Sequence, residues 1–221
     1  MPRNWQALTQ GEGFSNVMRL VHLAMRQDNI DQDAIRSALV KARRVEYEAT
    51  LSKMAAEIGC DRSALVSEGD TLNELNQLST VDAQSMINTY NYDLAVAIIT
   101  IRTETPTANR HVYAKRLATW DSNRSEWKNK QVAMNTVLTS RSMAQRDFMR
   151  LNTNLEGKAR LIGPDPAAEP ICQGWLNRGL VPADVAADNP SPFHPNCPHS
   201  WEFSLGWIDD RDKDCEGLWM G

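Results

Sequence analysis

Four side chains near the C-terminal end of the sequence have the chemistry of metal ligands. They are Cys172, His194, Cys197 and His199. Sulfur and imidazole nitrogen at four positions suit a tetrahedral Zn²⁺ ion. The spacing from His194 to Cys197 is workable for two ligands of one ion, whereas His199 follows Cys197 by only two residues. The residues therefore predict a structural zinc site, of which His199 is the most crowded member.

Two other interpretations of these residues involve no structural metal. The cysteines and histidines are also compatible with a hydrogen-bonded cluster inside a small core of Trp175, Phe193 and Trp201. Alternatively, Cys172 and a histidine form a thiol nucleophile pair, for which Asp165 or Glu169 would have to orient the imidazole. The nucleotide-binding, serine-hydrolase and zinc-protease motifs are absent from the sequence. We therefore expect a protein that is not an enzyme.

The segment that carries these residues is rich in proline. Eight of the ten prolines lie between Pro164 and Pro198. Proline fixes φ and blocks helices, which predicts turns and extended chain. We expect short strands at 158–162 and 200–205, and one or two helical turns at 171–177 that end at Gly179. A module with so little regular structure buries little area and benefits from a metal as a staple.

The chain before this module has the apolar periodicity of helices. One amphipathic helix is expected at 14–28, and the next is capped by Asp31 or Asp33 and ends at Gly59. The apolar stripe of this second helix is expected to comprise Ile35, Leu39, Ala42, Val45 and Ala49. A short element marked by Leu72, Leu75 and Leu78 follows. A fourth element, capped by Thr80, is expected to turn Met86, Ile87, Tyr90, Leu94, Ala97, Ile98 and Ile101 to the core.

A long helix is expected to follow. Thr105 and Pro106 have the pattern of a helix start, a hydroxyl cap and a proline in the first turn. A continuous helix over 106–151 would be about 70 Å long. It must therefore break near 121–123 or project from the molecule. Its aromatic and apolar side chains repeat every seven residues and are expected to pack on a partner helix: Tyr113, Trp120, Trp127 and Met134.

Charge is distributed unevenly along the chain, although the formal net charge is only −4. Residues 102–160 carry 12 basic and 5 acidic side chains, a net charge of +7. Residues 161–221 carry 3 basic and 10 acidic side chains, a net charge of −7. The basic middle predicts a face that contacts DNA or an acidic partner, formed by Arg110, Lys115, Arg116, Arg124, Lys128 and Lys130. A solvated helix face is the alternative interpretation of the same charges.

Together these patterns predict a mainly α fold in three parts. Residues 1–156 are expected to form a helical bundle with one long helix, and 157–205 a small irregular α+β module that contains the Cys/His cluster. Residues 206–221 form an acidic tail, which is expected to dock on a basic partner or to be a disordered arm anchored by Trp207 and Trp219. The sequence lacks an apolar run long enough to cross a membrane. We expect no secretory signal, and the four widely spaced cysteines do not predict a disulfide framework.

Three stretches of the sequence resemble one known family. They are the helix from Ser140 to Asn152, the turn Cys172-Gln173-Gly174, and the segment Phe193-His194-Pro195-Asn196-Cys197-Pro198-His199. This combination resembles the C-terminal domain of the tailed-phage minor head proteins typified by the F protein of phage Mu. The resemblance covers about residues 133–205. That family often has Cys-x-x-Cys at the first turn, where this chain has Trp175, so His199 would have to replace a thiolate.

The resemblance implies a non-enzymatic virion protein, assembled in the host cytoplasm. It would lie at the portal or neck vertex, contact portal, capsid and neck proteins and possess homo-oligomeric contacts in the particle. It would aid head assembly or genome delivery, and its basic helix would face packaged DNA. A neck adaptor that forms a ring under the portal is the first alternative. A zinc-dependent nuclease-like module and a cellular helical interaction protein are the others.

Overall fold

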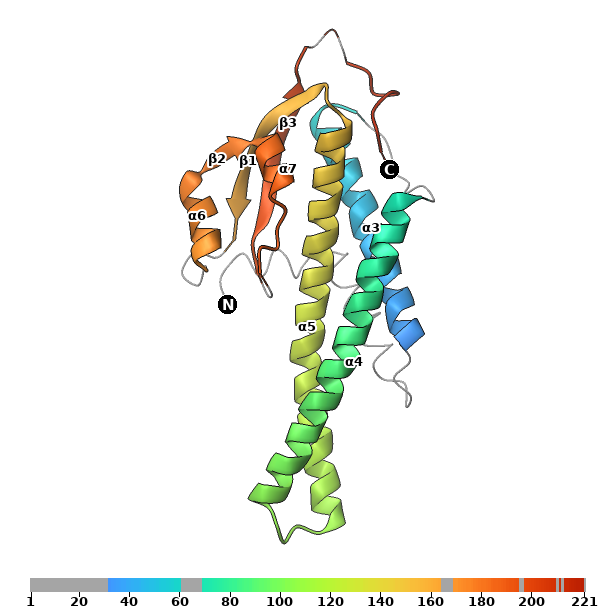
Figure 1. The fold of residues 1–221 in the computed structure, drawn as a ribbon, viewed down its shortest axis with the longest axis vertical. Coiled ribbons are helices and arrows are strands. Elements are labelled where there is room, and N and C mark those ends of the chain that lie inside the picture. The colour runs from blue at the N-terminus through green and yellow to red at the C-terminus, as the bar shows by residue number, and fades with distance from the viewer. Residues whose placement is uncertain are drawn as a thin grey trace.

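The computed structural model describes residues 32–60, 69–163, 169–194, 197–209, 211 and 213–220. The helix expected at 14–28 lies outside these residues. Within them the chain is mainly helical, with one small sheet near the C-terminal end (Figure 1). This confirms the fold class predicted from the sequence. None of the described helices is long and apolar enough to span a bilayer.

Three long helices form the body of the molecule: α3 (Gln32–Glu57), α4 (Asp70–Glu104) and α5 (Arg110–Leu151). Helix α3 packs against both α4 and α5. Helices α4 and α5 run antiparallel as a hairpin, and the end of this hairpin projects far beyond α3 (Figure 1). Since α5 has 42 residues, it is about 63 Å long at 1.5 Å per residue. The helix is continuous through 121–123. Of the two expected arrangements, a broken helix or a projecting helix, the structure has the projecting helix.

The buried face of α3 agrees with the expected stripe in its first half only. Ile35, Leu39 and Ala42 are buried, but Val45 is 45% exposed and Ala49 is also exposed. The second half of the face is formed instead by Glu46, Tyr47, Thr50, Leu51 and Met54. The apolar pattern was misleading because a buried glutamate occupies this face. The helix ends as expected at Gly59, which has φ +82°.

The expected third and fourth elements are one helix, contrary to the sequence-based prediction. Thr80 lies inside α4, and its hydroxyl donates to the Asn76 carbonyl oxygen instead of capping a new helix. The residues expected in the fourth element are helical, as predicted, and they include the β-branched run 98–101.

The expected helix start at Thr105 and Pro106 is also wrong. The Thr105 hydroxyl donates to the Ile101 carbonyl oxygen and closes α4. Helix α5 begins at Arg110, where the Asn109 side chain accepts a hydrogen bond from the Val112 amide at 3.0 Å. Proline cannot continue a helix, so Pro106 marks the end of α4 rather than the beginning of α5.

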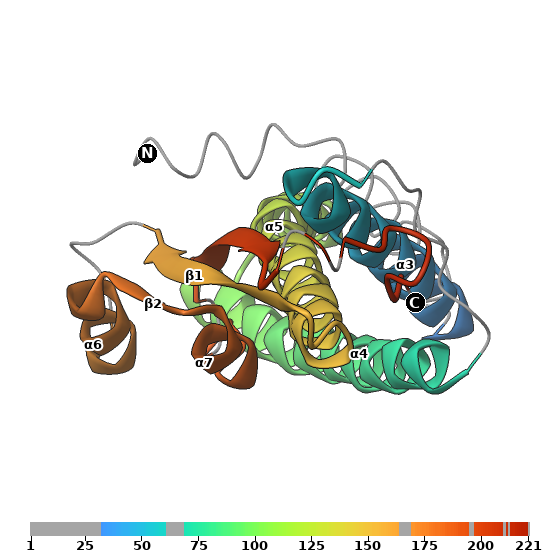
Figure 2. The same cartoon turned by 90° about the horizontal axis from the view of Figure 1, so that it is seen from above.

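A three-stranded antiparallel sheet lies beside the far end of α5 (Figures 1 and 2). It consists of β1 (Leu155–Ile162), β2 (Leu180–Pro182) and β3 (Ser200–Trp207), in the order β2-β1-β3. Strands β1 and β3 pair from Leu155 opposite Trp207 to Ile162 opposite Ser200. Two strands were predicted; β2 is additional. With three residues, β2 is too short to show the alternation of apolar and polar side chains that marks a strand in a sequence.

Two short helices complete the C-terminal module. Helix α6 (Pro170–Arg178) ends at Gly179, in agreement with the expected helical turns. Helix α7 (Ala183–Asp188) was not predicted and packs against α5. In both views α6 lies at the edge of the molecule furthest from the long helices (Figures 1 and 2).

One hydrophobic core joins the helices to the module. Its members come from α3, α4, α5, the sheet and the C-terminal residues, and include Tyr47, Phe148, Ala159, Trp201 and Leu218. The core therefore crosses the boundary expected at 156. A second cluster lies further along the bundle, where Ile35 and Leu39 of α3 meet Ala83 of α4 and Met134 of α5.

The C-terminal residues are tied to the body by three kinds of contact. Cys60 and Cys215 form a disulfide across 155 residues of sequence, a bond that the sequence analysis, which expected no disulfide framework, did not predict. The Trp219 amide donates to Asn152 Oδ1 at 2.7 Å, and Trp207 Nε1 donates to the Ile58 carbonyl oxygen at 3.1 Å. Leu218 and Met220 are buried. The chain is thus attached to the ends of α3 and α5 at Trp207, Cys215 and residues 218–220, whereas most described residues between 208 and 217 are exposed.

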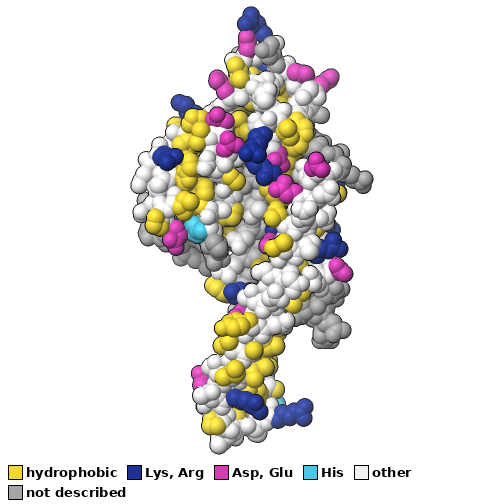
Figure 3. Space-filling view, in the orientation of Figure 1, with side chains coloured by type: hydrophobic (Ala, Val, Ile, Leu, Met, Phe, Trp, Pro, Cys, Tyr) yellow, Lys and Arg dark blue, Asp and Glu magenta, His cyan; other side chains and the backbone are white. Residues whose placement is uncertain are grey.

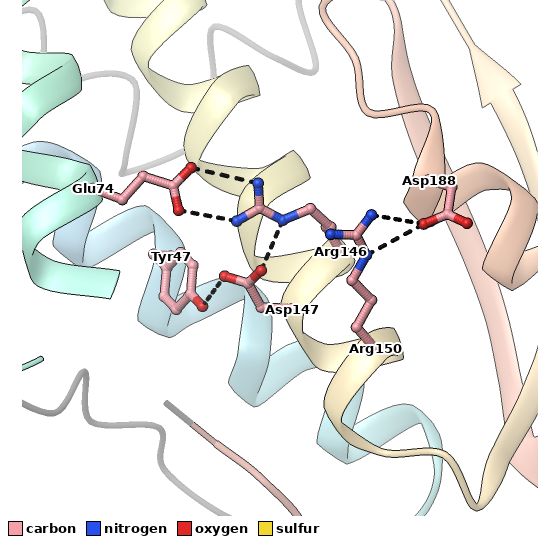
Figure 4. A network of polar contacts seen from close by, with 6 residues as sticks. All are labelled: Tyr47, Glu74, Arg146, Asp147, Arg150 and Asp188. Carbon is pink, nitrogen blue, oxygen red and sulfur yellow. Dashed lines mark hydrogen bonds and ion pairs between the residues drawn. The ribbon is translucent and has the colours of Figure 1, made fainter. Parts of the chain in front are cut away.

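Ion pairs and hydrogen bonds lock α5 to its neighbours (Figure 4). Arg146 pairs with Glu74 of α4 and with the adjacent Asp147. Asp147 also accepts a hydrogen bond from the Tyr47 hydroxyl of α3 at 2.7 Å. One turn further on, Arg150 pairs with Asp188 of α7 at 2.8 Å. Four elements therefore meet at this end of α5, which orients the module on the bundle.

Candidate metal centre

Cys172 is placed by the short helix α6. The helix begins with Pro170, which is favoured in the first turn because it lacks an amide hydrogen. Cys172 is fully buried, two residues further along. The exposed residues on either side, Ile171 and Gln173, point away from the core. The helix therefore directs one thiol inward.

His194 and Cys197 are brought together by a tight turn that precedes β3. The Cys197 amide donates to the His194 carbonyl oxygen at 3.1 Å. Cys197 is fully buried and His194 is partly exposed. A turn of this kind places the side chains of its first and last residues on one side, as the spacing predicted.

The three side chains meet in a compact group. Cys172 Sγ lies 3.2 Å from His194 Nε2 and 3.5 Å from Cys197 Sγ. All three ligand atoms lie within 4.8 Å of one another. Around a tetrahedral Zn²⁺ with ordinary bond lengths, sulfur and nitrogen ligands lie about 3.5 to 3.8 Å apart. The group can therefore hold a metal ion with small side-chain adjustments.

His199, the fourth predicted ligand, stands at the edge of this group. Its Nδ1 lies 3.5 Å from Cys197 Sγ, and the residue is fully buried. It is not among the three residues whose ligand atoms all lie within 4.8 Å of one another. Its ring packs on Gly163, where an added Cβ would lie 2.3 Å from His199 Cδ2. Gly163 thus makes room for the imidazole, a role that sequence reasoning did not identify.

The surroundings of the Cys172 thiol disfavour its charged form in the absence of a cation. Burial raises the pKa of the Cys172 thiol to about 12, and the neighbouring Cys197 and Glu169 add to the shift. A divalent cation reverses this balance because it binds the thiolate and displaces the proton. The described groups near the thiols thus supply little positive charge, which a metal would provide.

Three aromatic rings form a wall beside the group. Trp175 stacks on Phe193, with ring centroids 6.2 Å apart, and meets Trp201 edge-on at 5.4 Å. Trp201 Nε1 donates to the Asn189 carbonyl oxygen, so its buried N–H is satisfied. This is the small core predicted from the sequence. It coexists with the metal-ligand group instead of replacing it.

Two hydrogen bonds tie the module to α5 near this wall. Ser142 and Ser191 share a hydrogen bond of 3.0 Å between their buried hydroxyls. Gln145 Nε2 donates to the Trp201 carbonyl oxygen at 3.0 Å. These hydrogen bonds join the helix 140–152 to residues that flank the segment 193–199, and Cys172 contacts His194 and Cys197 of that segment directly.

The predicted basic residues lie on the projecting part of α5, far along the helix from the metal group. Two of them are paired within the hairpin. Arg124 forms an ion pair of 2.9 Å with Asp93 and covers the rings of Tyr90 and Trp120. Arg116 lies 3.4 Å from Glu104. Lys128 Nζ lies over the ring of Trp127, 4.7 Å from its centroid. The other predicted basic residues on this part of α5 are Arg110, Lys115 and Lys130.

The four side chains of α5 that were expected to pack on a partner helix differ in their burial. Met134 is buried in the body of the bundle, whereas Trp127 is 56% exposed. Tyr113 and Trp120 are partly buried against α4, and the Tyr113 hydroxyl donates to the Ile98 carbonyl oxygen. Tyr92 and Val96 of α4, which are exposed beside them, were not among the residues expected on the core face of that helix.

No family model, curated protein or solved structure matches this chain.

Proposed function

We propose that this chain is a non-enzymatic structural protein of a tailed-phage virion, a minor head protein at the portal or neck vertex. One observation carries the proposal. A compact Cys/His module is fixed to one end of α5, and the other end of the same helix projects from the body with α4 (Figure 1). A rigid base with a long exposed hairpin suits a protein that bridges neighbours in an assembly.

The positions of the resembling stretches support the proposal. Cys172 contacts His194 and Cys197 directly. Ser142 and Gln145 of the helix contact Ser191 and Trp201, which lie two residues before and two residues after the segment 193–199. The three stretches are therefore near one another in the fold. Their contact is what a shared domain requires.

The metal in this proposal is a structural zinc ion. Two thiolates and an imidazole are ligands that favour zinc over magnesium or calcium. His199 would supply the fourth ligand. Cys172, Cys197 and His199 are fully buried, and His194 alone is partly exposed. Structural zinc sites are closed, whereas catalytic sites keep a position open for water. Burial therefore favours the structural role over the nuclease-like alternative.

Localisation of the chain in particles tests the proposed function. Particles are induced from the strain that carries the gene, purified on a density gradient and probed with an antibody against the chain. We expect it to sediment with mature particles in few copies and to cross-link to the portal protein. A chain that remains entirely in the soluble fraction would contradict the proposal. A stoichiometry equal to that of the portal would instead favour the neck adaptor.

A further inference from the structure

The projecting part of the hairpin contains an open groove of about 1120 Å³. Its walls are the last four turns of α4 and the first five turns of α5. Four of its apolar side chains are unusually exposed: Tyr92 (71%), Val96 (45%), Val112 (42%) and Trp127 (56%). Figure 3 shows hydrophobic side chains gathered along this part of the molecule, with Lys and Arg near its end. Exposed apolar surface of this kind is typical of an interaction site.

The groove continues the surface on which α3 packs in the body. Ala83 of α4 and Leu138 of α5 lie in the cluster beneath α3. Residues three and four apart share one face of a helix. Such steps from Ala83 lead along α4 to Ala97, which lines the groove. The same steps backward from Leu138 lead along α5 to Trp127, which also lines it.

The shape of the groove therefore suits a helix. In the body, α3 is the third helix beside α4 and α5, and the described residues place no third helix along the groove. From Tyr92 to Glu104 the α4 wall is about 18 Å long, and from His111 to Lys128 the α5 wall is about 26 Å long. These lengths accommodate a helix of about 12 to 17 residues.

The charge of the groove selects an acidic occupant. Residues 88–130 carry seven basic and four acidic side chains, a net charge of +3. Three of the four acidic groups already interact within the hairpin: Asp93 with Arg124, Glu104 with Arg116, and Asp121 with Tyr90. Lys115 and Lys128 line the groove and have no carboxylate partner among the described side chains. Carboxylates on the flanks of a bound helix would pair with these two lysines.

We propose that this groove binds an amphipathic helix of another protein, with an apolar face and acidic flanks. The inference rests on the proposed function, because it names the chemistry of the neighbour that the hairpin would contact in the particle. Helix-in-groove recognition uses apolar anchors at positions i, i+3, i+4 and i+7. Trp127, Val96 and Tyr92 offer the apolar surface for these anchors.

Other occupants fit less well. Two copies of the hairpin would bring surfaces of the same positive sign together. The helix expected at 14–28 of this chain carries Arg19 and Arg26 against Asp28, so its charge is unfavourable too. DNA would use the lysines but would leave the valine side chains without a partner, because phosphate contacts need cations and not apolar surface.

Binding of designed peptides to the full chain tests the inference. The probe is a fluorescent helix of about 16 residues, with leucines on one face and glutamates on its flanks. Its control is a scrambled peptide of the same composition, in which the leucines are spread around the helix. Fluorescence anisotropy at moderate salt measures both affinities. We expect the amphipathic peptide to bind at least about tenfold more tightly than the scrambled one.

Variants of the chain locate the binding site. We expect Trp127→Ala to weaken binding about tenfold or more, and Lys115→Glu with Lys128→Glu to weaken it by a similar factor that salt reduces. Lys41→Glu is the matched control, since Lys41 is an exposed lysine of α3 outside the groove. It should leave the affinity unchanged. Circular dichroism of each variant confirms that the helices are intact.

Three results would overturn the inference. The first is equal binding of the amphipathic and scrambled peptides. The second is full competition by a DNA duplex together with no effect of Trp127→Ala, which would assign the surface to DNA. The third is a cross-link from Lys128 to residues 14–28 in the free chain that excludes the peptide, which would make the occupant a segment of the chain itself. Peptide binding and particle localisation are separate measurements, so either proposal can fail alone.

Discussion

The Sγ atoms of Cys172 and Cys197 lie 3.5 Å apart, although the two residues are 25 positions apart in the sequence. A helix positions one thiol and a turn positions the other, and His194 completes the group. This arrangement leads directly to the first prediction.

The first prediction concerns the metal content of the purified protein. We expect about one zinc ion per chain by plasma mass spectrometry. Cys197→Ser removes a ligand and should abolish stoichiometric binding. The Cys60→Ser, Cys215→Ser double variant is the control, because it removes two cysteines outside the group without leaving a new free thiol and should retain the metal. Folded protein with reduced thiols and no bound metal, even after incubation with zinc, would contradict the prediction.

The second prediction tests the space beside His199. In Gly163→Ala the added Cβ would lie 2.3 Å from His199 Cδ2, so the imidazole or the strand end must move. We expect lower stability by about 1 to 3 kcal/mol and weaker zinc retention against a chelator. Gly174→Ala is the control, because nothing lies within 4 Å of its added Cβ. Gly174 lies in α6, and alanine has a higher helix propensity than glycine. Equal zinc retention in the two variants would show that His199 does not depend on this space.

The third prediction concerns the hydrogen bond between Tyr47 and Asp147 (Figure 4). Burial and the nearby carboxylate raise the pKa of Tyr47. A raised pKa means that the native state favours the protonated phenol, so this contribution is complete below about pH 10, the unfolded value, and is lost as pH rises further. Tyr47→Phe should cost about 1 to 2 kcal/mol at neutral pH.

The pH dependence distinguishes this hydrogen bond from packing alone. Denaturant unfolding at pH 8 and at pH 10.5 should show a steeper loss of stability in the natural chain than in Tyr47→Phe. Tyr92→Phe serves as the control, because Tyr92 is 71% exposed. Parallel curves for the natural chain and Tyr47→Phe would mean that the ionisation of this phenol is not linked to folding.

The fourth prediction concerns the disulfide between Cys60 and Cys215. It closes a long loop, so its loss should destabilise the oxidised protein by about 2 to 5 kcal/mol. A reducing agent should lower the unfolding temperature of the natural chain and have little effect on the Cys60→Ser, Cys215→Ser double variant. Measuring both with zinc present keeps the other thiols occupied. If the reducing agent shifts the two proteins equally, the stabilisation does not come from this bond.

The sequence predicted the helices well where the signals are local. The glycine stops at Gly59 and Gly179 behaved as expected, because the preference of glycine for positive φ acts at a single residue. The β-branched run near the end of α4 is helical although its local propensity favours a strand. The sequence-based prediction misplaced the start of α5 because Thr105 and Pro106 suit both a helix end and a helix start. It also missed the second half of the α3 face, where Glu46 is buried because Arg141 pairs with it at 2.7 Å.

For the candidate site, residue types and the His194–Cys197 spacing determined the chemistry, since the turn that joins those two ligands is local. Only the tertiary structure decided that Cys172 completes the group, that Gly163 makes room for His199 and that Cys60 reaches Cys215. These relationships join residues many positions apart, so no local pattern encodes them. Likewise the heptad repeat of α5 predicted a partner helix. Only the position of α3 in the structure determined that the repeat is covered at Met134 and open at Trp127.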